Sequence, residues 1–112
     1  MQLSTVAILL VAALHIVFFI LESVLWTSPR VIRLFEHTEE EATATRVLAL
    51  NQGFYNLGSA ALLIWFYATG NTEGVLGVLV FLVFMGVVGA LTANWRIILL
   101  QSTPAAVALL LL

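Results

Sequence analysis

The sequence contains neither cysteine nor lysine, and only 9% of its residues are charged. Without cysteine, the chain can form no disulfide and offers no thiolate for catalysis or for zinc binding. About a quarter of the residues in a soluble domain are usually charged, whereas 62% of the residues here are hydrophobic. No dense basic cluster of the kind that binds nucleic acid is present, so we expect no nucleic-acid partner. The composition therefore excludes an ordinary soluble domain.

Long apolar runs account for almost the whole chain. A helix needs about 20 mainly apolar residues to cross the bilayer core, and candidate segments lie at about 3–26, 39–68, 74–93 and 97–112. Inside a bilayer each segment must satisfy its own backbone hydrogen bonds, which favours helices. We therefore predict an all-α fold, an integral membrane four-helix bundle in which residues 1–112 form a single transmembrane domain. Because MQLST at the start has no Lys or Arg, we expect a retained first helix and not a signal peptide.

The arginines predict the orientation in the membrane. Arg30 and Arg33 lie between the first and second helices, Arg46 lies at the start of the second, and Arg96 lies between the third and fourth. Positively charged connections stay on the cytoplasmic side of a membrane. We therefore expect a multi-pass protein of the inner (plasma) membrane, with the 1–2 and 3–4 connections in the cytoplasm and both termini outside.

The first connection has a predicted helix of its own. Ser28-Pro29 is typical of a helix start, and apolar residues then repeat at i, i+3 and i+4 over residues 29–36. This pattern favours a short amphipathic helix lying on the membrane surface. Thr38 and Glu41 match a capping box, which predicts the start of the second long helix at residue 39.

Ionisable and amide side chains interrupt two of the apolar segments. His15 and Glu22 are seven residues apart on the first helix, so they share one face, which Trp26 extends. Ionisable residues inside membranes are expensive and usually face the interior of a bundle or a watery cavity. His15 and Glu22 are therefore our candidate catalytic residues, as a proton donor and acceptor.

The second helix carries the sequence NQGFYN at residues 51–56. Its amides and tyrosine repeat at helical spacing and form one broad polar face. Counting by depth, we expect Asn56 and Tyr55 near His15, and Asn51 and Gln52 near the level of Glu22. Gln101 on the fourth helix is predicted at that same level, next to a backbone acceptor freed by Pro104. The predicted binding residues are His15, Glu22, Trp26, Asn51, Gln52, Tyr55, Asn56 and Gln101.

The order H-x6-E-x3-W, A-x-N-Q-G-x-Y-N, G-A-L-T and Q-x-x-P-A resembles the DUF1304 family (domain of unknown function 1304). This family comprises small four-helix integral membrane proteins of bacteria and some fungi, so the resemblance implies the same topology but no established activity. It extends from His15 to Ala105. A common variant has Glu before the first-helix histidine, where this chain has Leu14. The matching positions are His15, Glu22, Trp26, Asn51, Gln52, Gly53, Tyr55, Asn56, Gln101 and Pro104.

Three functions remain open at this point. The one we favour is binding of a hydrophobic small molecule or lipid in a polar pocket inside the bundle, with proton-transfer chemistry as an extension. The second is a small proton-coupled transporter that acts as a dimer. The third is a structural or assembly protein, although interhelical hydrogen bonds in membranes average only about 0.6 kcal/mol and a dense amide face exceeds that need.

The predicted partners follow from the same features. A membrane protein contacts lipid. Gly86 and Ala90 of the third helix have the spacing of closely packed helices, which indicates packing either inside the bundle or between the two protomers of a homodimer. One histidine and one carboxylate do not make a metal centre, so no metal and no cofactor are predicted.

Overall fold

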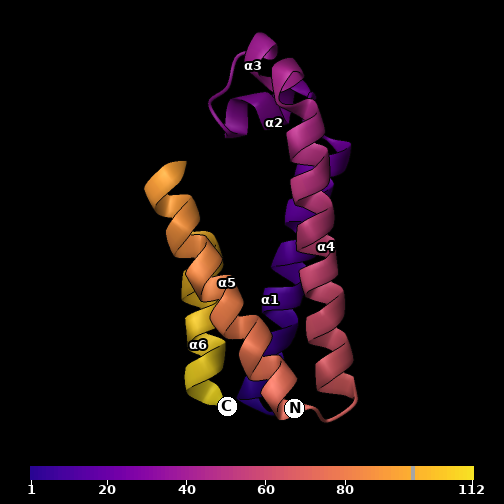
Figure 1. Ribbon diagram of the computed structural model, residues 1–112, viewed down its shortest axis with the longest axis vertical. Coiled ribbons are helices and arrows are strands. Elements are labelled where there is room, and N and C mark those ends of the chain that lie inside the picture. Colours follow the sequence, from indigo (N-terminus) through magenta and orange to yellow (C-terminus); the bar gives the residue numbers. More distant parts are fainter. Residues whose placement is uncertain (97) are drawn as a thin grey trace. The chain divides into compact units, whose positions relative to one another are not determined.

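The computed structural model describes residues 1–96 and 98–112, and over these ranges the chain is helical with no strand. The all-α prediction is therefore confirmed for the described residues. The elements, in chain order (Figure 1), are α1 (Leu3–Phe19), η1 (Ile20–Val24), α2 (Pro29–Leu34), α3 (Glu39–Ala44), α4 (Arg46–Ala68), α5 (Thr72–Thr92), η2 (Ile98–Ser102) and α6 (Thr103–Leu111), where η denotes a π-helix.

Three helical segments in the described part of the chain are long and apolar enough to cross a membrane: Leu3–Val24, Arg46–Ala68 and Thr72–Thr92. The last apolar helix, Leu99–Leu111, is shorter than the roughly 20 residues that a bilayer core requires. Its predicted first residue, Ile97, lies outside the described residues.

Two predicted helix starts are confirmed by their capping bonds. The Ser28 side chain accepts a hydrogen bond from the Val31 amide at 3.4 Å, with Pro29 as the first residue of α2. The Thr38 hydroxyl accepts a bond from the Glu41 amide at 3.1 Å and donates to the Glu41 carboxylate at 3.2 Å. Both signals are local, which is why the sequence alone could show them.

The helix predicted over 39–68 is divided at Thr45 into α3 and α4. The Thr45 hydroxyl donates to the Glu41 carbonyl at 2.7 Å. A threonine that bonds back to a preceding carbonyl often bends a helix, which accounts for the break. At the end of α2, Glu36 has a positive φ of 59°, and the His37 amide donates to the Ile32 carbonyl at 3.0 Å, so the chain leaves α2 through a Schellman-type turn.

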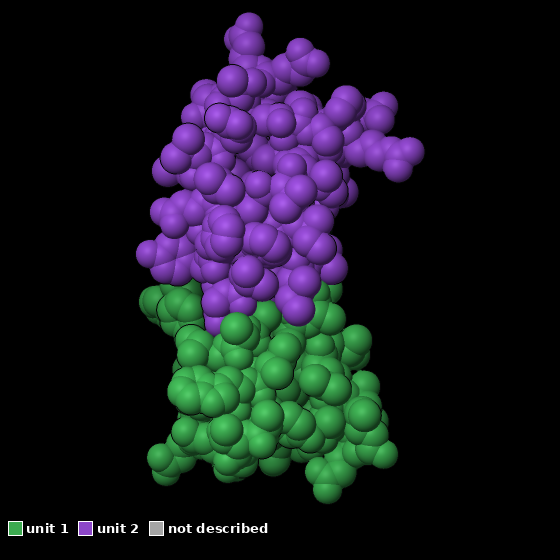
Figure 2. All heavy atoms as spheres, turned by 90° about the vertical axis from the view of Figure 1, so that its right-hand side faces the viewer, with its two compact units in different colours: residues 1–14, 59–112 green, residues 15–58 purple. Residues whose placement is uncertain are grey.

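The chain forms two compact units, which are described separately below (Figure 2). Unit 1 comprises residues 1–14 and 59–112, and unit 2 comprises residues 15–58. Unit 1 therefore contains the start of α1, the end of α4, and α5, η2 and α6. Unit 2 contains the end of α1, η1, the short helices α2 and α3, and the start of α4.

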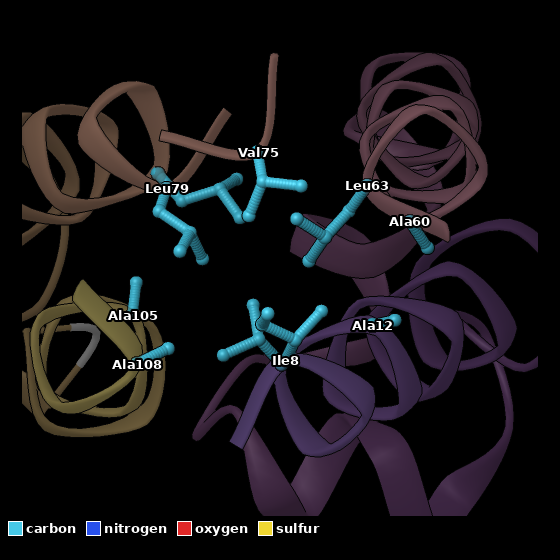
Figure 3. Close-up of a cluster of buried hydrophobic side chains, with 10 residues drawn as sticks. Ile8, Ala12, Ala60, Leu63, Val75, Leu79, Ala105 and Ala108 are labelled. Atoms are coloured by element: carbon cyan, nitrogen blue, oxygen red, sulfur yellow. The ribbon is translucent and has the colours of Figure 1, made fainter. Parts of the chain in front are cut away.

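The core of unit 1 is built from small and branched apolar side chains. Ile8, Leu63 and Leu79 are almost fully buried and point toward one another from three helices (Figure 3). Ala105 and Ala108 of α6 contribute no side chain beyond Cβ and are fully buried. Alanines at these positions let α6 approach the neighbouring helices closely.

Within unit 1, η2 is attached to the backbone of α5. The Ser102 hydroxyl donates to the Val83 carbonyl at 2.9 Å, and the Gln101 amide donates to the Leu82 carbonyl at 3.1 Å. A Cβ at Gly86 would lie 2.0 Å from the Ser102 hydroxyl oxygen and 3.0 Å from its amide nitrogen. Gly86 therefore packs against η2 within the chain, which is one of the two alternatives predicted for it, and the homodimer stays a prediction.

A hydrogen bond between Thr5 of α1 and Tyr67 of α4 joins two helices of unit 1, with 2.5 Å between the hydroxyl oxygens. Replacing Tyr67 with phenylalanine removes this bond and should lower the free energy of unfolding by about 0.5–1 kcal/mol. We expect Thr5→Val to lower the free energy of unfolding by a similar amount. The double variant Thr5→Val/Tyr67→Phe should lower it by little more than either change alone. Titration with sodium dodecyl sulfate in mixed micelles measures all three, and additive losses would show that the two hydroxyls are not coupled.

Candidate functional site

Unit 2 contains a seam of hydrogen bonds between the segment formed by η1 and the turn after it and, on the other side, α4 with Thr45 just before it. We call this the polar seam. The Ser23 hydroxyl donates to the Leu50 carbonyl at 2.8 Å. The indole nitrogen of Trp26 donates to the Thr45 hydroxyl at 3.1 Å. The third bond joins the Asn56 amide to the Glu22 carboxyl.

The chain reaches the polar seam through a π-helical turn. The Leu25 amide donates to the Ile20 carbonyl at 3.0 Å, which is the i to i+5 spacing of a π-helix. The wider turn changes the direction of the side chains that follow it, and single π-turns occur frequently at functional sites. Trp26, predicted as the last residue of the first helix, lies in the turn that follows η1.

Gly53 allows α4 to approach η1 within the polar seam. A Cβ at this position would lie 2.0 Å from the Ser23 hydroxyl oxygen and 3.1 Å from the Phe19 carbonyl oxygen. The rings of Phe19 and Phe54 close the contact edge to face, with centroids 5.1 Å apart. A side chain larger than glycine would push the two elements apart.

Glu22 and Asn56 form the polar centre of the seam. The Asn56 Nδ2 atom donates to Glu22 Oε1 at 2.5 Å. Asn56 is 9% exposed and Glu22 is half-buried. Among the described residues, no donor reaches the second carboxyl oxygen, Oε2. The carboxyl therefore has one oxygen held by the protein and one that can accept a hydrogen bond from a bound molecule.

The hydrogen-bond partner of Asn56 is not the residue that its predicted depth in the membrane suggested. Asn56 was expected beside His15, but it bonds to Glu22, nearly two helical turns further along the first segment. The long Glu22 side chain reaches a different turn of α4 than its Cα position indicates. His15 is 1% exposed and packs edge-on against Phe18, with ring centroids 5.2 Å apart. Since the described hydrogen bond of Glu22 goes to Asn56, the structure does not join Glu22 directly to His15.

The remaining predicted binding residues lie outside the seam. Asn51, Gln52 and Tyr55 are exposed on α4, Tyr55 with 69% of its surface accessible. Gln101 belongs to unit 1 and bonds to the α5 backbone. Of the predicted set, the polar seam thus contains Glu22, Trp26 and Asn56.

Sequence reasoning missed the aromatic cluster that follows the seam. The ring centroids of Trp26 and Phe35 are 5.1 Å apart, and those of Trp26 and His37 are 5.2 Å apart. The cluster holds the end of α2 against the turn after η1. Ser23 was also missed as a seam residue, because a hydroxyl in an apolar helix gives no sign of which carbonyl it will meet. Thr45 lies one heptad before Gln52 on the predicted polar face, but its bond to the Trp26 indole was not predicted.

A groove of about 170 Å³ opens beside the polar seam and is contained in unit 2. We call it the Arg46 groove. Sites for drug-sized ligands are larger, about 300–1,000 Å³, so this groove suits only part of a larger molecule. A second hollow, of about 330 Å³, lies in unit 1 beside the α4–α5 turn and contains none of the predicted binding residues. The residues lining the Arg46 groove are Ser23, Val24, Trp26, Thr27, Arg46, Val47 and Leu50.

Comparison with known proteins agrees with the pattern on α1, η1 and α4. Residues 9–112 match the family described as "Protein of unknown function (DUF1304)". The chain belongs to the DUF1304 family. It is similar to the uncharacterized protein YpaA of Lactococcus lactis subsp. lactis (strain IL1403), with 30% identity over 98% of this chain and 97% of YpaA. No solved structure matches the chain at a significant level. The DUF1304 match includes the whole polar seam and the NQGFYN sequence.

Proposed function

We propose that this DUF1304 protein is a multi-pass membrane protein that binds a hydrophobic small molecule or lipid through the Glu22 carboxyl. The observation that carries the proposal is the Glu22–Asn56 bond, which fixes one carboxyl oxygen and leaves the other without a donor in the described residues. An ionisable group within a helix of membrane-spanning length is a functional candidate by default, because its cost must be offset. The ligand chemistry that fits is an apolar molecule with one hydroxyl or amine that donates to Oε2.

The membrane topology is part of the proposal. Three apolar helices of spanning length and a shorter fourth support a four-helix arrangement. Arg30, Arg33, Arg46 and Arg96 all lie at connections or helix ends, which favours the cytoplasm for the 1–2 and 3–4 connections and the outside for both termini. The proposed location is the plasma membrane.

Proton transfer is the chemical extension of this proposal. A carboxyl whose Oε2 meets a donor can accept that proton, and the Asn56 amide then remains bonded to Oε1. The same carboxyl is what a dimeric proton-coupled transporter would use, so Glu22 supports this second candidate as well. The two candidate functions differ in one respect: a proton-coupled transporter moves protons across the membrane, and a ligand-binding protein does not.

Replacement of Glu22 by glutamine tests the proposal with little structural change. Glutamine keeps an oxygen that accepts from Asn56, so the free energy of unfolding should fall by less than about 1 kcal/mol. Its amide nitrogen then occupies the place of Oε2 and cannot accept a hydrogen bond. We expect a co-purified small molecule or lipid in native mass spectra of the wild-type protein and at least a tenfold weaker signal for Glu22→Gln.

Glu40→Gln is the matched control, because Glu40 is exposed in the first turn of α3 and away from the seam. It should retain the ligand as the wild type does. Equal retention by Glu22→Gln, or no bound molecule in either protein, would contradict ligand binding at Glu22 and leave the seam a packing device. Proton flux into liposomes that depends on Glu22 would select the transporter.

A further inference from the structure

The Arg46 groove changes in polarity along its length. Arg46 and Thr27 are exposed and form its polar end. Val24 and Val47 have 65% and 70% of their surfaces exposed, and Leu50 has 43%, so the other end presents apolar side chains. From Arg46 to Leu50 the groove follows a little over one turn of α4, about 6 Å along the axis.

The charge on the groove has one sign. Arg46 is its cation, and none of its lining residues is acidic, although unit 2 also contains Glu22, Glu36 and the acidic first turn of α3. No carboxylate of the described chain pairs with Arg46, and Thr27 makes no described hydrogen bond. A guanidinium and a hydroxyl without protein partners are suited to the oxygens of a phosphodiester.

The groove also contains a rigid aromatic wall. Trp26 is half-buried, and its indole nitrogen is already bonded to Thr45, so the ring orientation is fixed. Tryptophan is enriched where a membrane protein meets the lipid headgroups. The amphipathic helix α2 follows two residues after Thr27, with Val31 buried and Arg30 and Arg33 exposed, as in helices that lie at the membrane surface.

We infer that the Arg46 groove binds the headgroup of an anionic phospholipid. The phosphodiester lies against Arg46 and Thr27, and the glycerol and first methylenes lie on Val24, Val47 and Leu50. The groove volume of about 170 Å³ fits a headgroup and not a whole lipid, whose chains remain in the bilayer. Glu22 does not line the groove, so the contacts proposed for the headgroup do not use the carboxyl proposed to bind the other ligand.

Quenching of Trp26 fluorescence by brominated lipid tests the site directly. The background variant Trp65→Phe/Trp95→Phe removes two exposed tryptophans and leaves Trp26 as the reporter. In vesicles with equal amounts of phosphatidylglycerol and phosphatidylcholine, one of the two brominated, we expect phosphatidylglycerol to bind beside Trp26 about fivefold more strongly. Arg46→Gln should reduce this preference to about one, whereas Arg33→Gln, which removes an exposed arginine outside the groove, should lower it by a much smaller factor.

Equal quenching by both lipids in the background variant overturns the inference, even if Arg46→Gln fails to insert. An unchanged preference for phosphatidylglycerol in the Arg46→Gln variant would also overturn the inference. Millimolar glycerol 3-phosphate should not reverse the quenching, because the apolar half of the groove contributes to binding. Full reversal would show a site for free phosphate esters and contradict the lipid assignment.

Discussion

Replacing Gly53 with alanine should lower the free energy of unfolding by about 2–3 kcal/mol, a large effect for one methyl group. The new Cβ would lie 2.0 Å from the Ser23 hydroxyl oxygen, so that side chain must leave its bond to the Leu50 carbonyl. Rotation of Ser23 does not relieve the clash, because its Cβ at 3.0 Å and the Phe19 carbonyl oxygen at 3.1 Å are also too close. The backbones of η1 and α4 must therefore separate, which weakens the Glu22–Asn56 bond as well.

Gly58→Ala is the matched control on the same helix. Apart from its chain neighbours and the backbone of its own helix, no described atom lies within 4 Å of a Cβ at Gly58. Alanine there should cost nothing and can add up to about 1 kcal/mol through higher helix propensity. Titration with sodium dodecyl sulfate in mixed micelles compares the two variants, and equal stabilities would contradict a close approach at Gly53.

What could be predicted from the sequence is what depends on neighbouring residues. The caps at Ser28 and Thr38 involve groups three residues apart, and both predictions are confirmed. The apolar lengths of Leu3–Val24, Arg46–Ala68 and Thr72–Thr92 are also local properties. They required no knowledge of which helix packs against which.

What could not be predicted depends on contacts between helices. The π-turn at Ile20–Val24 leaves no mark in the apolar run, and the bond that Glu22 of this turn makes goes to α4, thirty-four residues later in the chain. At the break, the Thr45 hydroxyl donates to the nearby Glu41 carbonyl and also accepts from Trp26, nineteen residues earlier in the chain, and only the first of these contacts is local. A depth count along ideal helices therefore did not show that Asn56 bonds to Glu22.

The NQGFYN sequence illustrates the same limit within six residues. Helical spacing places Gly53 and Asn56 on one face of α4, and both are buried against the polar seam or within it. Asn51 and Tyr55 point elsewhere and are exposed. The prediction of one broad polar face treated all the polar residues of NQGFYN alike, although their surroundings in the structure differ. Composition showed that polarity was present, and only the fold shows that Asn56 is bonded to a carboxyl.

Replacing Asn56 with aspartate should be the most damaging conservative change in unit 2. It places a second carboxyl against Glu22, where 2.5 Å now separates the Asn56 nitrogen from the Glu22 oxygen. Two carboxylates at this distance cannot both be ionised, so one must take up a proton. We expect a loss of about 2–3 kcal/mol at neutral pH, much larger than the roughly 0.6 kcal/mol of an average interhelical hydrogen bond. Acidification should restore most of the stability, since one shared proton joins the two groups.

The double variant Glu22→Gln/Asn56→Asp separates charge repulsion from simple loss of packing. It reverses the roles across the seam, because the amide at position 22 now donates to the carboxylate at position 56. Its stability should return to within about 1 kcal/mol of the wild type and lose the steep dependence on pH. A double variant no more stable than Asn56→Asp would mean that helix packing, and not the acid–amide bond, sets the stability of unit 2. Recovery of stability without recovery of the bound molecule would instead show that the carboxyl must belong to η1, as binding through Glu22 Oε2 requires.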